Sequence, residues 1–509
     1  MADKDTTVHT GEGTRSIDMD TPSYTGAHAV PARPAGWMYK GFKIGNTEIW
    51  YASPKVQLLM VSIVCFLCPG LYNALGGIGG GGQLNAKIQD HASTATYSVF
   101  AFVGFFSGSF ANKLGIKITL AIGGIGYSLY SASFLCYNHT QNEGFVIFAG
   151  AFLGLCAGLL WTAQGAIMMS YPPEKSKGQY ISWFWIIFNL GGVIGAIIVL
   201  AQNIHNDTGT VNDGTYVAFI VLMLAGAALA MFLCNADKVI RDDGSKVIIM
   251  KNPTWKSEFI GLWECISLSP WVVALFPMFF ASNIFYTYQQ NGVNQAHFNL
   301  RTRSLNSLLY WLSQILGAIV FGYALDFTKA RRSVRAKGSL AMLFVLTFAI
   351  WGGGYAFQKK QDSRSLTSQA SYEPEKMDWT SPGFIGPMFL YFFYGFYDAC
   401  WQTSVYWYMG ALSNSGRRVA NLAGFYKGIQ SAGAAIFWRL DGLGTSYDTL
   451  FAVTWAICAA SLLIAAPVIV WQIKDTTEIE QDLKFSDETI EDVAPPAVLD
   501  EKRAHDPTV

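Results

Sequence analysis

The sequence predicts an all-α membrane protein with twelve transmembrane helices arranged as two six-helix bundles. Three observations support this prediction. Hydrophobic residues make up 51% of the 509 residues and charged residues only 14%, with a mean hydropathy of +0.28. A soluble domain carries about 25% charged residues. Twelve apolar runs are each long enough to cross a bilayer, and one long polar stretch divides them six and six.

Each expected span is an apolar run of about 20 residues, the length that crosses a bilayer as a helix. The runs are continuous, which favours helices over the alternating strands of a membrane barrel. Serine and threonine dilute the start of the second run. The expected spans are 56–76, 93–112, 117–136, 145–170, 178–201, 215–235, 270–289, 304–325, 338–357, 384–410, 419–439 and 447–471.

These spans set the expected domain boundaries. Residues 1–50 are polar and contain proline, so we expect a disordered cytoplasmic tail and no signal peptide. The N-terminal six-helix bundle covers 51–236 and the C-terminal bundle covers 270–472. A cytoplasmic linker, 237–269, joins them. Residues 473–509 are acidic and are expected to form a second disordered tail.

The distribution of lysine and arginine predicts that both termini face the cytoplasm. In that orientation the inner connections contain 16 of these residues and the outer connections contain 8. Two glycosylation sequons, at Asn138 and Asn206, then fall in outer loops, which agrees with the orientation. The pattern predicts an integral multi-pass protein, with plasma membrane and endomembranes both left open.

Charge and motifs argue against several classes of function. Lysine plus arginine equals aspartate plus glutamate, 35 each, so no basic excess indicates a nucleic-acid partner. Most of the eight cysteines lie in apolar runs and are interpreted as packing residues. Enzyme motifs such as HExxH and GxSxG are missing, and the GxGxxG string at Gly77 follows a spanning helix instead of a strand. We therefore expect no enzyme, no cofactor and no metal.

Two polar loops, 108–117 and 322–332, share a glycine followed by polar and basic residues. The glycine lets two helices approach, while an acid and bases form a breakable network at the cytoplasmic helix ends. The first copy has Asn112 where the acid is expected, which weakens that network. The alternative is an ordinary positive-inside loop. The predicted inside-gate residues are Gly108, Asn112, Lys113, Gly322, Asp326 and Arg331.

Polar and aromatic side chains within the spans predict a central substrate cavity. Asp398 lies ~18 Å deep by helical rise and should face protein or water, because an aspartate in lipid costs roughly 2.5–3.5 kcal/mol. Lys427 is the only other charge well inside a span, so a structural ion pair, a substrate or cation site, and no contact all remain open. For the amides and aromatics, helix–helix hydrogen bonding is the alternative. The candidate residues are Asn73, Trp161, Gln164, Trp185, Asn189, Asp398, Trp401, Gln402, Lys427 and Gln430.

Arg301 and Arg303 lie in an expected outer segment that begins near Tyr286. Two outer arginines oppose the positive-inside bias, so we expect them to have partners. An outer gate or an anion contact is the functional interpretation. A helix cap or a contact with lipid headgroups is the alternative.

Four segments together resemble the Unc-ninety-three-like family, a divergent branch of the major facilitator superfamily. They are GLYNALGGIGGGGQ (70–83), LLWTAQGAIMMSYP (159–172), QQNGVNQAHFNLRTRSLN (289–306) and YGFYDACWQTSVYWYMGALSN (394–414). The resemblance covers residues 50–470 and is closest to poorly characterised members. It implies the major facilitator architecture with a central cavity between its halves.

The resemblance leaves two functions open. The first is a transporter that moves a small solute by alternating access. The second is a non-transporting regulatory or trafficking partner of an ion channel or receptor, as animal relatives are regarded. An aqueous cavity that reaches Asp398 would favour transport. A collapsed cavity or a lipid-facing polar stripe would favour the regulatory or trafficking partner. In both cases membrane lipid surrounds the protein.

Overall fold

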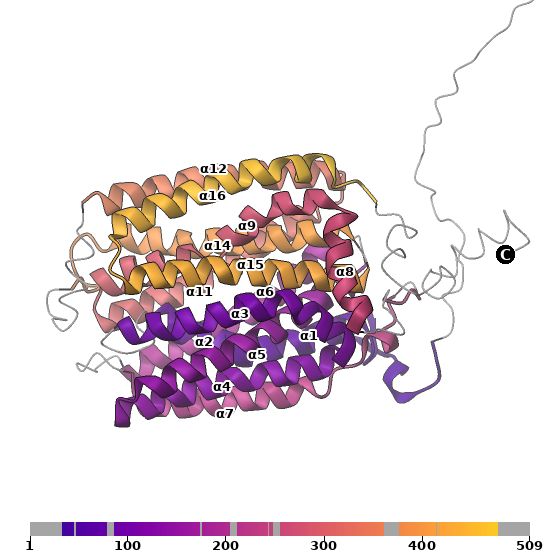
Figure 1. Ribbon diagram of the computed structural model, residues 1–509, viewed down its shortest axis with the longest axis horizontal. Helices are drawn as coiled ribbons and strands as arrows, with labels where there is room; N and C mark the ends of the chain where they lie inside the picture. The colour runs from indigo at the N-terminus through magenta and orange to yellow at the C-terminus, as the bar shows by residue number, and fades with distance from the viewer. Residues whose placement is uncertain are drawn as a thin grey trace, which may run out of the picture.

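The computed structural model describes residues 33–44, 47–78, 86–173, 176–203, 211–242, 244–247, 255–360, 376–413 and 415–476. Long helices run side by side through the whole molecule (Figure 1). Ten helical segments among these residues are long and apolar enough to cross a membrane. The predicted all-α membrane fold is thereby confirmed.

The first half of the molecule begins with a broken span. Helix α1 (Pro54–Cys65) passes through a π-helical turn, η2 (Phe66–Gly70), into α2 (Leu71–Gly77). The turn contains Pro69, which has no backbone N–H to continue a regular helix. The later spans are α3 (Ala86–Leu114), α4 (Ile116–Thr140), α5 (Glu143–Ser170), α6 (Lys177–Asn203) and α7 (Asp213–Ala230).

The second half also begins with a broken span. It consists of the 3-10 helix η6 (Pro270–Leu275), the short helices α9 (Phe276–Ala281) and α10 (Phe285–Thr287), and the π-helical η7 (Tyr288–Gln295). The long helices that follow are α11 (Leu300–Leu325), α12 (Arg332–Gln358), α14 (Ile385–Leu412), α15 (Gly416–Gly442) and α16 (Tyr447–Trp471).

Helices α14 and α15 occupy two of the twelve expected spans but are not among the ten apolar ones. They are 28 and 27 residues long, so length does not set them apart. The two helices differ from the ten apolar spans in polarity. Asp398 lies on α14 and Lys427 lies on α15, and both side chains are buried. Both helices run inside the bundle, between α12 and α3 in Figure 1. Neighbouring helices therefore surround the polar groups that lipid could not accommodate.

The halves meet mainly along two helix pairs: α3 packs against α15, and α6 packs against α11. Helix α5 also contacts α15, and α6 contacts α14. Glycines allow this close approach. A Cβ atom at Gly104 of α3 would lie 2.7 Å from the backbone nitrogen of Gly428 on α15. A Cβ atom at Gly322 of α11 would overlap the side chain of Ser182 on α6. The two halves therefore meet along backbone surfaces with little space between them.

Part of the expected N-terminal tail is ordered. Residues 33–50 contain the 3-10 helix η1 (Trp37–Tyr39) and an antiparallel pair of strands, β1 (Phe42–Ile44) and β2 (Thr47–Ile49). The Trp50 ring is buried, and the Arg33 guanidinium lies 3.8 Å from its centroid. The expectation of disorder fails here because this aromatic anchor docks the segment. Residues 1–32 and 477–509 lie outside the described residues.

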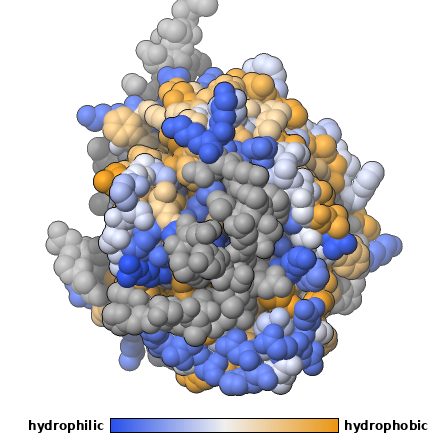
Figure 2. Space-filling model, turned by 90° about the vertical axis from the view of Figure 1, so that its left-hand side faces the viewer, coloured by the Kyte–Doolittle hydropathy of each residue, from blue (hydrophilic) through white to orange (hydrophobic). Residues whose placement is uncertain are grey.

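We call the end where α1 begins and α16 ends the tail end, and the opposite end the far end. The connection between the halves contains the 3-10 helix η5 (Ala236–Lys238) and α8 (Trp255–Ser267), which crosses the tail end (Figure 1). Ile260 and Trp263 on α8 are exposed. Figure 2 views the far end, where hydrophilic side chains gather around the residues drawn in grey.

Candidate functional site

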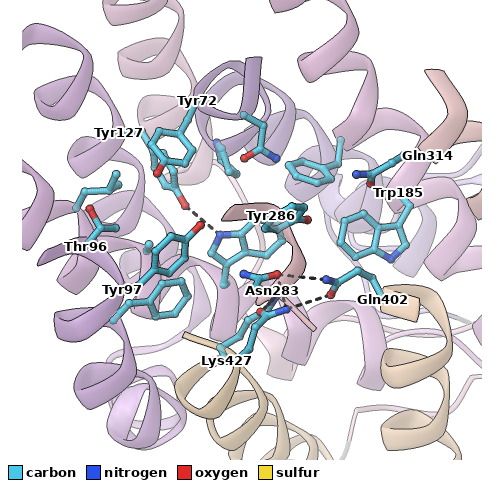
Figure 3. Close-up of a pocket in the computed structure, with 18 of the residues that line it drawn as sticks. Tyr72, Thr96, Tyr97, Tyr127, Trp185, Asn283, Tyr286, Gln314, Gln402 and Lys427 are labelled. Atoms are coloured by element: carbon cyan, nitrogen blue, oxygen red, sulfur yellow. Dashed lines mark hydrogen bonds between the residues drawn. The ribbon is translucent and has the colours of Figure 1, made fainter. Parts of the chain in front are cut away.

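A small cavity lies between the two halves (Figure 3). Its volume, for the centres of water-sized molecules, is about 70 Å³, enough for roughly five waters at about 10–15 Å³ each. Aromatic, hydroxyl and amide side chains of both halves form its walls. Six of the predicted cavity residues line it: Asn73, Trp161, Trp185, Gln402, Lys427 and Gln430.

Asp398 is fully buried on α14, directly behind the cavity wall. Its Oδ2 accepts hydrogen bonds from the hydroxyls of Tyr286 (2.6 Å) and Tyr310 (3.2 Å) and from Nε2 of Gln314 (2.6 Å). Its Oδ1 accepts from Nε2 of Gln402 at 3.2 Å. Four donors therefore stabilise the carboxylate away from lipid. Three of the four donor residues line the cavity, whereas Asp398 itself does not.

Lys427 is the buried cation of the site and lies on α15 at the cavity wall. Its Nζ donates a hydrogen bond to Oε1 of Gln430 at 2.8 Å. Three aromatic rings surround the same atom, with centroids 4.5 Å (Trp161), 4.7 Å (Tyr426) and 5.3 Å (Tyr406) from Nζ. Ring faces stabilise an ammonium group through cation–π attraction. In the part of the chain that the structure describes, aromatic rings and an amide oxygen hold the lysine without an ion pair.

Among the described residues, no ion pair joins Asp398 to Lys427. Instead, amide groups connect them: Nε2 of Gln430 donates to Oε1 of Gln402 at 3.3 Å, and Gln402 donates to Asp398. Asn283 belongs to the same network, because its Oδ1 accepts from Gln430 at 3.0 Å. Figure 3 shows Lys427, Asn283 and Gln402 facing the same space. The two charges therefore belong to one hydrogen-bonded chain without touching.

Three other predicted cavity residues do not line the cavity. Gln164 contacts the sulfur of Met168 at 3.4 Å, and Nε1 of Trp401 donates to the Ser282 hydroxyl at 3.0 Å. Asn189 is buried, and neither its Nδ2 nor its Oδ1 has a hydrogen-bond partner in the described part of the chain. Helical spacing identifies side chains that share a face of a span, but it does not show which of them reach the cavity.

Sequence reasoning missed most of the groups that hold Asp398. Tyr310 and Gln314 are four residues apart on α11 and so share one face, which was the available signal. Tyr286 lies near the expected boundary between a span and an outer segment, and the helical span continues past it to Gln295. Asn283 and Tyr97 are among the other cavity-lining residues that the sequence analysis does not predict.

The tail end is closed by contacts between the halves. Nζ of Lys177, at the first residue of α6, donates to the backbone oxygens of Gly410 (2.7 Å) and Ser413 (3.3 Å) at the end of α14. A helix C-terminus carries partial negative charge and unsatisfied carbonyls, so it suits an ammonium group.

Asp326 makes the complementary contact. Its Oδ2 accepts from the backbone N–H of Gln179, in the first turn of α6, at 2.7 Å. A helix N-terminus suits a carboxylate for the same electrostatic reason. Burial raises the pKa of Asp326, although this backbone hydrogen bond and the cation of Arg335, 3.6 Å away, act in the opposite direction. Each half thus places a charge on a helix end of the other.

The other predicted inside-gate residues have different environments. Gly108 lies where α3 meets α15, 3.5 Å from a Cβ atom built at Gly424. Asn112 is half-buried, whereas Lys113 and Arg331 are exposed. Gly108 and Asp326 therefore lie beside the opposite half, and Arg331 is the N-cap residue of α12, where its side chain makes no cap hydrogen bond.

The far end is closed by asparagines of η7. Nδ2 of Asn291 donates to Asp90 of α3 at 3.0 Å and to Asp441 of α15 at 2.7 Å. Nδ2 of Asn294 donates to the backbone oxygen of Gly77, at the end of α2, at 3.0 Å. The two carboxylates are only 3% and 4% exposed. Sequence reasoning missed them because both lie at the polar margins of their spans.

Arg301 has a partner, but within its own half. Its Nε and Nη2 donate to the two oxygens of Asp378, each at 2.7 Å. This bidentate contact holds the pKa of Asp378 well below its ordinary value. Arg303 is buried, and its backbone oxygen accepts from Asn294 at 3.1 Å. The outer-gate role of the two arginines stays a prediction, whereas Asn291 and Asn294 are seen to contact the opposite half.

The remaining sequence predictions concern modification and metals. Asn138 is half-buried near the far end of α4, and its Nδ2 donates to Asp213 at 2.9 Å. Asn206 lies outside the described residues. Within the described ranges, no group of three or more His, Cys, Asp and Glu residues is arranged to hold a metal ion.

Comparison with known proteins gives a consistent picture. The model of the Major Facilitator Superfamily matches residues 56–437. UNC93-like protein C922.05c of Schizosaccharomyces pombe is 49% identical over 473 residues, which cover 92% of this chain and 93% of the relative. UNC93-like protein 1 of Arabidopsis thaliana is 40% identical, covering 85% and 94%. The proton:xylose symporter XylE has a TM-score of 0.58 at 10% identity, covering 83% of this chain and 98% of that one.

Proposed function

The chain belongs to the UNC93-like branch of the major facilitator superfamily, and from that premise we propose that it moves a small solute across the membrane by alternating access. One observation carries the proposal. The cavity between the halves contains a buried cation and hydrogen-bonding groups, and separate sets of polar contacts close the two ends. A protein that exposes one site to alternate sides needs this arrangement.

The contacts seen at each end include hydrogen bonds that can break and form again. A hydrogen bond to a charged group contributes about 1.5–3 kcal/mol. At the far end, the Asn291–Asp90 bond and the bond from Asn294 to a backbone oxygen join the halves. At the tail end, Lys177 and Asp326 do so. A ligand that binds one form more tightly than the other shifts the population toward that form.

Lys427 is the proposed anchor for the solute. Asp398 already accepts four hydrogen bonds, so its oxygens are occupied. The ammonium of Lys427 has three N–H donors, faces the cavity and donates to Gln430. A small solute with a negatively charged or strongly hydrogen-bond-accepting group fits this donor, and the rings of Trp161 and Tyr97 offer its apolar part a surface.

We propose the orientation that the positive-inside bias predicts, with the tail end toward the cytoplasm. Lys177, Arg241 and Arg335 lie at that end, in contact with backbone carbonyls of the bundle. The far end, which contains the Asp90 and Asp441 carboxylates, then faces the outside or an organelle lumen.

The alternative is a non-transporting partner of a channel or receptor. One observation favours it: the cavity holds only a few waters and stops at the residues that bind Asp398. A partner protein has no need to open this cavity. The same measurement separates the two functions, because only a transporter moves solute in the absence of other proteins.

The test is uptake by vesicles that contain only the purified protein, with a panel of small anions, zwitterions and neutral solutes. We expect saturable uptake of an anionic or acceptor-rich solute and its loss in Lys427→Gln. Lys337→Gln is the matched control, because Lys337 is an exposed lysine on α12. If no solute moves while the protein from its native membrane co-purifies with a channel or receptor, the partner function replaces transport.

A further inference from the structure

A groove between α12 and α16 lies outside the proposed transport route. Its volume is about 690 Å³, within the range of ligand sites. The two helices run side by side along the edge of the bundle that is farthest from α4 and α7 (Figure 1). Exposed Phe348 and Tyr355 belong to one wall, and exposed Ala452 and Ala456 leave the groove open. In a membrane this surface faces lipid.

The far-end margin of the groove has charges of both signs. Lys359 and Asp448 both line it and both are exposed. Lys359 begins the loop after α12, and Asp448 is the second residue of α16, so both lie where a lipid headgroup meets the ends of the helices. An ammonium and a carboxylate above an apolar groove complement the phosphate and the ammonium of a zwitterionic phospholipid.

Two hydrogen bonds link Asp448, the acidic residue of this margin, to the segment η7 that closes the far end. Asp448 Oδ1 accepts from Nε2 of Gln358 at 2.9 Å, and Gln358 Oε1 accepts from the hydroxyl of Tyr288 at 2.7 Å. Tyr288 is the first residue of η7, which contains the asparagines of the far-end closure. Tyr447 packs on the same segment, since a Cβ atom at Gly292 would lie 2.9 Å from its ring.

We propose that one phospholipid with a zwitterionic headgroup binds in the α12–α16 groove and stabilises the closed far end. Its phosphate lies at Lys359 and its ammonium at Asp448, with an acyl chain along the alanines of α16. Because Asp448 orders Gln358, which in turn holds Tyr288, the bound headgroup favours the arrangement of η7 seen here. The protein therefore responds to the composition of the leaflet at its far end.

The test uses the full-length protein in nanodiscs of phosphatidylcholine or of anionic phosphatidylglycerol, with retained lipid counted by native mass spectrometry. Ala456→Trp fills the groove. Ala356→Trp is the matched control, because this exposed alanine lies on α12 but lines the neighbouring groove toward α14. Asp448→Asn removes the charge but keeps an oxygen for Gln358. Hydrogen exchange of residues 288–295 reports on the far-end segment.

We expect wild type and Ala356→Trp to retain one phosphatidylcholine molecule, and Ala456→Trp to lose it. Asp448→Asn should lose the preference for phosphatidylcholine over phosphatidylglycerol, and exchange of 288–295 should be slower in phosphatidylcholine. Equal retention by all variants would show ordinary surrounding lipid and overturn the proposal. A second copy of the chain that is lost only in Ala456→Trp would show that a protein helix occupies the groove instead. None of these outcomes depends on transport.

Discussion

Replacing Asp398 by asparagine tests the arrangement of the buried site most directly. Three donors converge on Oδ2 and one on Oδ1, so an asparagine must direct its own N–H₂ group toward at least one donor. The least crowded choice faces Gln402. That amide would have to turn, but its oxygen already accepts from Gln430 and Tyr426. The substitution therefore disturbs the whole chain that leads to Lys427.

The expected cost follows from these contacts. A hydrogen bond to a charged group contributes about 1.5–3 kcal/mol, and a buried donor without an acceptor costs about 1–3 kcal/mol. Asparagine loses one such bond and leaves the Gln402 donor without an acceptor, so we expect Asp398→Asn to lower the free energy of unfolding by about 2.5–6 kcal/mol. Asp398→Ala leaves four donors without an acceptor and should be more damaging, approaching the roughly 5–15 kcal/mol that stabilises a typical protein.

The assay is thermal or denaturant unfolding of the purified protein in one detergent. Thr403→Val is the matched control, because Thr403 is buried on the same helix and its hydroxyl has no hydrogen-bond partner among the described residues. We expect the control to match wild type. The double variant Asp398→Asn/Lys427→Gln should be less destabilised than the sum of the two single variants, because each buried charge offsets the other. Additive effects, or a control as unstable as Asp398→Asn, would refute this reasoning.

Three further predictions test the ends and the packing of the bundle. Lys177→Met should increase the reactivity of a cysteine placed at Ser182 toward a water-soluble maleimide, because the substitution removes hydrogen bonds that close the tail end. Unchanged reactivity would show that these hydrogen bonds do not keep the tail end closed. Burial lowers the pKa of His297 to about 4, so the unfolded chain binds the extra proton below pH 6.5. The contribution of His297 to the free energy of unfolding is therefore fully present above pH 6.5 and is lost toward pH 4, by up to about 3 kcal/mol. The melting temperature of His297→Gln should depend less on pH than that of wild type. An equal dependence would contradict this prediction. Gly104→Leu should prevent stable folding by forcing α3 away from α15, whereas Gly352→Leu, which meets open space, should fold normally in size-exclusion chromatography.

Most of the architecture could be predicted from the sequence because long apolar runs mark where a chain crosses a membrane. The sequence placed α14 and α15 correctly despite their polarity. It failed at the margins of spans, where polar residues are buried between helices instead of exposed in loops. Asp90 lies in α3 before the expected start at residue 93, and the helical segment that ends at Gln295 extends beyond the expected end at residue 289.

The site was predicted in part for a similar reason. Spacing of three and four residues identifies side chains that share a helix face, and it placed Gln402 beside Asp398. Spacing does not give the rotation of one helix relative to another. That rotation decides that Lys427 faces aromatic rings while Asp398 faces Tyr286. Whether Asp398 and Lys427 form an ion pair depends on how the helices pack against one another, and the sequence does not give that packing.

The polarity of α14 has a consequence for how the protein is synthesised. A helix with a central aspartate enters a bilayer unfavourably by itself, at roughly 2.5–3.5 kcal/mol for that residue alone. Three of the four donors to Asp398 come from α10 and α11, which the ribosome makes earlier. Nascent α14 must therefore meet those helices at the translocon before it is released into lipid. Variants of Tyr310 or Gln314 would then appear first as shortened half-lives during biogenesis, with degradation beginning before the chain is complete.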